Sequence, residues 1–351
     1  MKVYLRSSAC ISPQKTFGNE DFLAKPVEYN GTRLQTIEPD YKGYIDPKLI
    51  RRMSHVIKMG VASAKECLNK GSVQMPDAII TGTAYGCMEE TISFLTRVIE
   101  QDETLLSPTA FIQSTHNTVA AQISLLLQCH NYNNTFVHKG ISFESALLDG
   151  MMLLMENEGK NILVGGLDEM TDSSFTILTR LGQYKRQPVS NLSLLSNPSK
   201  GTIGGEGAAF FLLTDQPSAS NQAELTALKV LYNPSGIEED IVAFLKANSL
   251  ETDDIDLLIT GKNGDLKNDA VYKRLTTGLF NKTTVANYKH LCGEYPTSSA
   301  FALWAAVNII ETGIVPEVLI EKAISKTAPR KILICNHYQS KYYTLMLVSA
   351  I

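Results

Sequence analysis

The sequence has no excess of positive charge and no long apolar run. It contains 32 lysine or arginine residues and 36 aspartate or glutamate residues, which gives a formal net charge of −4. No basic surface therefore indicates a nucleic-acid partner. The first eleven residues alternate in polarity and include Lys2 and Arg6, so they lack the apolar centre of a signal peptide. Because no apolar stretch is long enough to cross a bilayer, we expect no membrane partner.

Cysteines are few and scattered. None of the six forms a Cys-x-x-Cys pair, so neither a zinc site nor a disulfide framework is indicated. We therefore expect no metal and no other cofactor. The compartment that this cysteine usage favours is a reducing cytoplasm.

Short apolar runs typical of strands alternate with helical patterns. Apolar residues recur every three to four positions between Phe143 and Leu154, and a further helix is expected from Pro296 to just before Gly313. Such alternation predicts βαβ units around a largely parallel sheet. The expected strands are Lys2–Leu5, Ala78–Thr81, Thr135–Val137, Asn161–Val164, Ala208–Leu213, Leu225–Leu231, Leu257–Thr260, Val285–Asn287, Lys331–Cys335 and Tyr343–Val348.

A weak internal repeat divides the chain. Residues 76–82 and 255–261 both read as a strand that ends in Thr-Gly, which favours a duplicated fold. A polar stretch at 215–222 has the composition of a boundary. These features predict an N-terminal half at 1–215 and a C-terminal half at 223–351.

Several short motifs occur in the order found in one family. A strand over 161–164 ends in Gly-Gly-Leu-Asp-Glu, a Gly-Glu-Gly-Ala-Ala segment lies at 205–209, and Lys289 precedes Gly293-Glu294. Ser107-Pro108, followed by Thr115-His116-Asn117 and a helix over 118–127, is similar to an interface segment. Together the motifs resemble the β-ketoacyl synthase family of condensing enzymes. The resemblance implies an α/β, thiolase-like fold with two duplicated βαβ halves in a layered α-β-α-β-α core.

The catalytic positions of that family are mostly occupied by other residue types. The resemblance places the nucleophile at Gly140 or Ser142, neither of which is cysteine. It places the first histidine at Gly261 and the second at Glu294, while the lysine is retained as Lys289. Glycine has no side chain with which to polarise a thioester carbonyl. The Glu294 carboxylate would repel an enolate if it is ionised, or donate a hydrogen bond if burial raises its pKa, and the first is the simpler interpretation. A structural Lys289–Glu294 pair is expected instead.

Other residues offer substitute chemistry. Ser142 is either a serine nucleophile or, as the simpler interpretation, a helix N-cap with Glu144 in the first turn. Cys292 is either a second candidate nucleophile or a small buried hydrophobe. His116 and His138 are candidate bases, whereas His290 and His337 are expected to be satisfied loop histidines. The flexible glycine gate of the family is replaced by His337-Tyr338-Gln339-Ser340-Lys341.

The resemblance also indicates an acyl pocket near a dimer interface. Tyr85 follows a Gly-Thr-Ala turn, and the corresponding family residue faces the end of the acyl channel. Its ring either caps that channel or is only an interface residue. Thr115, Asn117 and Phe143 are further candidates for the pocket or interface.

The main hypothesis is a non-condensing subunit, similar to the chain-length factors that pair with active ketosynthases in polyketide and aryl-polyene assembly. Its expected partners are a ketosynthase, an acyl carrier protein and an acyl thioester chain. One alternative is an acyltransferase with a rearranged site that uses Ser142 or Cys292. Another is a homodimer that binds acyl chains or the carrier protein.

Overall fold

The computed structural model describes residues 2–18, 21–104, 106–325 and 327–351. Within these ranges, eleven strands form one sheet and two short strands pair separately. The strands are β1 (Tyr4–Ile11), β2 (Asn30–Gly31), β3 (Ala78–Gly82), β4 (Tyr132–Phe136), β5 (Ile162–Asp168), β6 (Val189–Ser190), β7 (Gly207–Thr214), β8 (Ala223–Tyr232), β9 (Leu257–Thr260), β10 (Thr284–Asn287), β11 (Ile320–Lys322), β12 (Lys331–Tyr338) and β13 (Tyr342–Ser349).

The large sheet contains the same pattern twice. In one half the strand order is β4-β3-β5-β7-β1, and in the other it is β10-β9-β12-β13-β8, with β11 added at the edge. In both halves the second strand pairs in parallel with its two neighbours, and the remaining pairs are antiparallel. Two residue pairs between β1 and β8, Tyr4 with Glu224 and Leu5 with Ala223, join the halves. The predicted duplication is therefore present, and residues 215–222 connect β7 to β8. The prediction of a largely parallel sheet was wrong, because six of the ten described neighbouring strand pairs in the large sheet are antiparallel.

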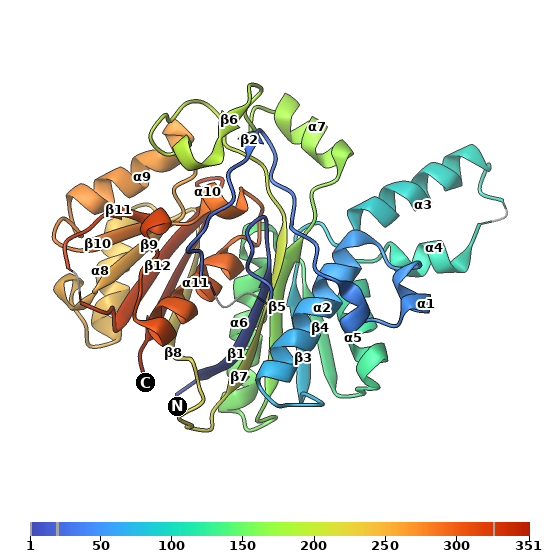
Figure 1. The fold of residues 1–351 in the computed structure, drawn as a ribbon, viewed down its shortest axis with the longest axis horizontal. Helices are drawn as coiled ribbons and strands as arrows, with labels where there is room; N and C mark the ends of the chain where they lie inside the picture. Colours follow the sequence, from blue (N-terminus) through green and yellow to red (C-terminus); the bar gives the residue numbers. More distant parts are fainter. Residues whose placement is uncertain (1, 19–20, 105, 326) are drawn as a thin grey trace.

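Helices lie on both faces of the sheet and between its halves (Figure 1). The described α-helices are α1 (Pro47–Ile50), α2 (His55–Lys70), α3 (Met88–Glu100), α4 (Pro108–Gln113), α5 (Thr118–Leu127), α6 (Ser142–Met155), α7 (Asp172–Arg180), α8 (Ile237–Ala247), α9 (Leu266–Thr277), α10 (Lys289–Cys292) and α11 (Ser299–Thr312). None of them is long and apolar enough to span a membrane.

Three apolar clusters define the layers. The central cluster joins α6 and α11 to both halves of the sheet and contains Ile80 and Ile259. A second packs α2 and α5 on the N-terminal half and contains Ile79. A third packs α8 and α9 on the C-terminal half and contains Leu258. Because neighbouring strand residues point to opposite faces, each buried apolar run covers two layers. This confirms the α-β-α-β-α arrangement.

Several predicted element bounds need correction. The strand predicted at Lys2–Leu5 is β1, which runs from Tyr4 to Ile11, and the strands predicted at Asn161–Val164 and Lys331–Cys335 extend to Asp168 and Tyr338. The helix predicted from Pro296 begins at Ser299, because residues 295–298 form a tight turn in which Ser298 N donates to Tyr295 O. It ends as predicted at Gly313, which has a positive φ of 68°. The strand predicted at 135–137 is β4, which begins three residues earlier and includes the polar Asn133 and Asn134.

One edge of the molecule is apolar and exposed. Strand β4 is the last strand of the sheet, and α3 and α4 extend away from the body on that side (Figure 1). Large apolar side chains are exposed on α3, α4, β4 and α6, namely Leu95, Ile99, Phe111, Ile112, Tyr132, Leu148, Met152 and Met155. An unpaired strand edge beside exposed apolar side chains is typical of a surface that another chain covers.

Candidate active-site region

The predicted catalytic positions lie close together in the fold. Gly140 precedes α6, Gly261 follows β9, and Lys289 and Glu294 lie in and just after α10. The end of β12 connects these segments: Tyr338 packs on Gly140, and the backbone carbonyl of His337 accepts a hydrogen bond of 3.1 Å from Lys289 Nζ. A cavity of about 420 Å³ beside them is lined by Glu294 and Tyr338, with ten other residues that include Tyr184, Lys200 and Asp265.

Lys289 and Glu294 form the expected ion pair. The lysine Nζ lies 2.9 and 2.8 Å from the two carboxylate oxygens, and the residues are 1% and 7% exposed. Asn263 Nδ2 donates a further bond of 2.6 Å to Glu294 Oε2. The carboxylate is therefore bound by two donors, which leaves it poorly placed to stabilise a developing enolate.

Gly140, one of the two predicted nucleophile positions, is covered by another side chain. A Cβ atom on Gly140 would overlap the Cβ of Tyr338 and lie 2.8 Å from its ring atom Cδ1. The Tyr338 hydroxyl lies 3.2 Å from the hydroxyl of Tyr85, so two tyrosines close over this point. A cysteine or serine side chain at position 140 would need Tyr338 to move.

Gly261 has no room for a side chain either. A Cβ atom there would overlap the Oδ1 atom of Asn336 and lie 2.6 Å from the hydroxyl of Tyr272. The space beside the predicted position of the first histidine is thus filled by an amide from β12 and a phenol from α9. The glycine of the other Thr-Gly repeat, Gly82, is equally crowded, because a Cβ atom there would overlap the backbone of Ser142. Both repeats therefore end at a glycine where a neighbouring segment leaves no room for a side chain.

A family profile, described as "Beta-ketoacyl synthase, N-terminal domain", matches residues 34–230, more than half of the chain. The chain belongs to the β-ketoacyl synthase family. No curated protein sequence matches it significantly.

Solved structures share the fold of this family member over its whole length. The ishigamide ketosynthase/chain length factor has a TM-score of 0.82 at 16% identity, over 100% of this chain and 99% of that chain. A beta-ketoacyl synthase from Burkholderia phymatum STM815 has a TM-score of 0.78 at 13% identity, over 100% and 99%. A structure of the ketosynthase ApeO with its chain length factor ApeC, from Xenorhabdus doucetiae, has a TM-score of 0.77 at 14% identity, over 100% and 98%. At such identities the likeness establishes the fold alone.

Ser142 is a loop-closing residue in this β-ketoacyl synthase-like chain. Its buried hydroxyl donates to Lys139 O at 2.8 Å and accepts from His138 N at 2.8 Å. The expected N-cap assignment is wrong by one residue, because Ile141 is the N-cap and Ser142 already belongs to α6. Glu144 lies in the first turn but is fully buried, and burial raises its pKa.

The alternative catalytic residues do not meet at one point. His138 bonds Ser145 Oγ at 3.0 Å through Nδ1, and among the described residues no histidine side chain bonds the Ser142 hydroxyl. His116 packs beside Gly86 in the loop before α3. Cys292 is fully buried and its thiol donates to Gly293 O at 3.3 Å. Burial raises its pKa well above the usual value, so it is a neutral thiol.

His337 is satisfied through both ring nitrogens, as expected, whereas Nδ1 of the buried His290 has no hydrogen-bond partner among the described residues; the two residues lie in β12 and α10 and not in loops. Nε2 of His290 bonds Val318 O and Nε2 of His337 bonds Asn268 O, both at 2.9 Å. Burial lowers their pKa values to about 4 and about 3. Each is therefore a neutral ring that donates to a backbone carbonyl, which does not equip it as a proton carrier at neutral pH.

The pocket and interface candidates separate into different environments. Tyr85 lies against Tyr338, which packs on Gly140, and the two tyrosine hydroxyls are 3.2 Å apart. Thr115 Oγ1 donates to Asn117 Oδ1 at 2.8 Å in the loop before α5. Phe143 is fully buried in the central layer, with its ring centroid 5.6 Å from that of Phe211, so it is a core residue.

Two contributions were missed from the sequence. Asp168, at the end of β5, accepts bonds from Thr83 Oγ1, Ala84 N and Tyr85 N at one oxygen, and from Thr297 at the other. It thereby fixes the loop that carries Tyr85. Asn263 was also overlooked as a partner of Glu294. The sequence did contain a signal for Asp168, which is an acidic residue two positions after the Gly-Gly pair of a buried strand.

Proposed function

We propose that this chain is a non-condensing subunit of the chain-length-factor type, which pairs with an active ketosynthase and contacts its acyl chain and carrier protein. The observation that carries the proposal is the packing of Tyr338 on Gly140. It removes the space that a cysteine nucleophile and its thioester would need. A condensing enzyme cannot form its acyl intermediate without that space.

The other two catalytic positions support the same conclusion. Asn336 and Tyr272 fill the space at Gly261, and Lys289 holds Glu294 as a structural ion pair. No side chain at either position is free to polarise a malonyl carbonyl. Three independent changes at one point favour loss of condensation over a shift of one catalytic residue.

The exposed apolar edge supports a partner subunit. The free edge of β4 and the exposed residues of α3 and α4, among them Ile99 and Phe111, offer a surface for a second chain of the same fold. One structural relative is a ketosynthase in complex with its chain length factor. A heterodimer with an intact Cys-His-His ketosynthase is the assembly that this surface and the covered site favour together.

The purified chain alone is expected to form no condensation product from acyl and malonyl thioesters of an acyl carrier protein. The physical reason is that Gly140, Gly261 and Glu294 supply neither a nucleophile nor a carbonyl-polarising donor. Radiolabelled product analysis, with and without a co-expressed ketosynthase from a neighbouring gene, tests this. Efficient condensation by the chain alone would refute the proposal.

Intact-mass measurement on the same samples separates the proposal from the acyltransferase alternative. No covalent acyl adduct is expected, because the Ser142 hydroxyl is bonded within its loop and the Cys292 thiol is neutral and buried. An adduct that Ser142→Ala or Cys292→Ala abolishes would establish the rearranged acyltransferase instead.

Tyr85→Ala is expected to lengthen the product of the reconstituted pair. The substitution removes a ring from the Tyr85–Tyr338 contact, and the space it leaves admits more of a growing chain. Mass spectrometry of the released chains measures the effect, and size-exclusion chromatography verifies assembly. An unchanged product from an assembled pair would assign Tyr85 to packing alone.

A further inference from the structure

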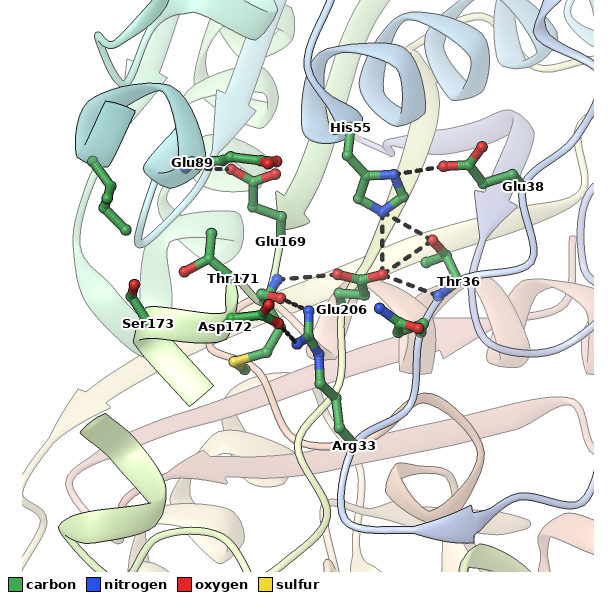
Figure 2. A pocket seen from close by; sticks show the side chains of 13 residues that line it. Arg33, Thr36, Glu38, His55, Glu89, Glu169, Thr171, Asp172, Ser173 and Glu206 are labelled. Carbon is green, nitrogen blue, oxygen red and sulfur yellow. Dashed lines mark hydrogen bonds and ion pairs between the residues drawn. The ribbon is translucent and has the colours of Figure 1, made fainter. Parts of the chain in front are cut away.

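A second and larger cavity lies away from the covered site. Its volume is about 640 Å³, and neither Gly140, Gly261, Lys289 nor Glu294 lines it. It is bounded by the loop 33–38, the first turns of α2, α3 and α7, and the segments that follow β5 and precede β7 (Figure 2). The lining residues are Arg33, Gln35, Thr36, Glu38, His55, Glu89, Ile92, Glu169, Met170, Thr171, Asp172, Ser173 and Glu206.

The cations of this cavity already have partners. Arg33 Nη1 lies 2.6 Å from Asp172 Oδ1, and its Nη2 donates to Met170 O. His55 lies between Glu38, 2.9 Å from Nδ1, and Glu206, 3.1 Å from Nε2. Burial opposes the protonation of His55, but the hydrogen bond and charge of Glu206 outweigh it and raise the pKa. Five acidic residues thus surround one arginine and one histidine.

Two carboxylates form no ion pair among the described residues. Glu169 is 3% exposed, and its Oε1 atom accepts only the backbone N–H of Glu89, at 3.0 Å. Its Oε2 atom and the side chain of Glu89 have no hydrogen-bond or ion-pair partner among the described residues. Figure 2 shows the two carboxylates next to each other, and their charges repel. Glu169 is thus an almost fully buried residue whose second carboxylate oxygen is open to the cavity and lies beside a second carboxylate, with no ion-pair partner in the described part of the chain.

We infer that this cavity is a binding site for a small organic ammonium ligand, whose charged nitrogen lies between Glu169 and Glu89. An ammonium group has three donors and no acceptor, which matches unpartnered carboxylate oxygens. Ile92 and Met170 provide apolar contacts for an attached alkyl chain, and Thr171 and Ser173 provide hydroxyls. The volume lies within the usual range for small-molecule sites, about 300–1,000 Å³.

A bare metal ion fits less well. In the described ranges, no group of three or more His, Cys, Asp or Glu side chains is arranged to hold one. The cavity is also far larger than an ion requires, and Glu206 and Glu38 are already engaged by His55.

Binding should depend on pH in a defined direction. Burial, together with the charges of Glu89 and Glu206, raises the pKa of Glu169 to about 7, although His55 opposes the shift. Arg33 and Asp172, the other charged groups of the cavity on this side, neutralise each other. An ammonium ligand favours the ionised carboxylate, so binding releases a proton and affinity rises between about pH 6 and about pH 8.

Calorimetric titration of the full chain with 1,4-diaminobutane tests this inference, with 1,4-butanediol as the neutral match. Saturable binding of the diamine alone is expected at a constant ionic strength. Glu169→Gln should weaken it by roughly tenfold to a hundredfold, because a charge-assisted bond is lost. Glu89→Gln should also weaken binding. Because the Glu89 side chain is exposed, misfolding of this variant would not account for the loss of affinity. Glu156→Gln, an exposed change at the end of α6, is the matched control.

Three results would overturn the inference. Equal affinity of the parent chain and both variants would show that neither carboxylate holds the ligand. Equal heats from the diamine and from tetramethylammonium chloride would indicate charge screening only. Binding of Nα-acetyl-lysine methylamide without binding of the diamine would identify a lysine of another protein, and not a free amine, as the occupant.

Discussion

Lys289→Met is expected to lower the free energy of unfolding by about 3–5 kcal/mol, because it leaves the buried carboxylate of Glu294 without its charge partner. The pair is almost completely inaccessible, and Lys289 also donates to His337 O, so the change breaks three hydrogen bonds. Asn263 keeps one bond to Glu294, which offsets part of the loss. The denaturant concentration at the unfolding midpoint measures the effect.

Lys229→Met is the matched control for this prediction. Its ion pair with Asp240 has the same length, 2.8 Å, but both side chains are about one-third exposed. Water screens such a pair, so its loss should cost at most about 1 kcal/mol. If Lys289→Met costs no more than Lys229→Met, the retained family lysine has no structural role. The double variant Lys289→Met/Glu294→Leu should recover part of the stability, since it leaves no lone buried charge.

Gly140→Cys is expected to destabilise the chain without creating a condensing enzyme. The new Cβ would overlap Tyr338, and overpacking of this kind costs about 1–3 kcal/mol. Adding Tyr338→Ala should relieve most of that cost, so the two changes should couple in a double-mutant cycle. Neither variant is expected to condense thioesters, because Gly261 and Glu294 still lack the family's histidines.

Gly43→Cys is the control for the same cycle, because no atom lies within 4 Å of a Cβ placed there. It should change stability little and should not couple to Tyr338→Ala. Additive effects of Gly140→Cys and Tyr338→Ala would mean that Tyr338 does not cover position 140 in solution. Measurable condensation by the double variant would indicate that the tyrosine alone had blocked catalysis.

Much of the fold was predictable because its buried strands are continuous apolar runs. Each of the ten predicted strands has a counterpart, and the bounds 257–260 agree with β9. The hydrophobic pattern failed to predict very short strands and the polar parts of longer ones. Strand β2 has only two residues, and β4 contains Asn133 and Asn134 because one of its edges is unpaired in the chain. The start of α11 was misplaced because proline is equally compatible with a turn and a first helical turn.

The candidate site was predictable only where its partners are close in sequence. Lys289 and Glu294 are five residues apart, and their pairing followed from charge and spacing. The cover on Gly140 comes from Tyr338, almost two hundred residues later, and depends on which side chain of the β12–β13 hairpin turns inward. No local pattern encodes that direction. Ser142 shows that local predictions also fail when a helix boundary is misplaced. The helix begins one residue earlier than expected, so the predicted N-cap is the first residue of α6.

The position of the first strand has a consequence for synthesis on the ribosome. Strand β1 lies inside the sheet, where Tyr4 pairs with Thr214 on one side and with Glu224 on the other. At typical rates of about 5–20 residues per second, the nascent chain carries this apolar strand unpaired for roughly 10–40 seconds. Helix α2 can cover only one of its faces in that time. Strand β1 therefore stays open to non-native contacts for longer than a strand whose pairing partner is adjacent in sequence, such as β12.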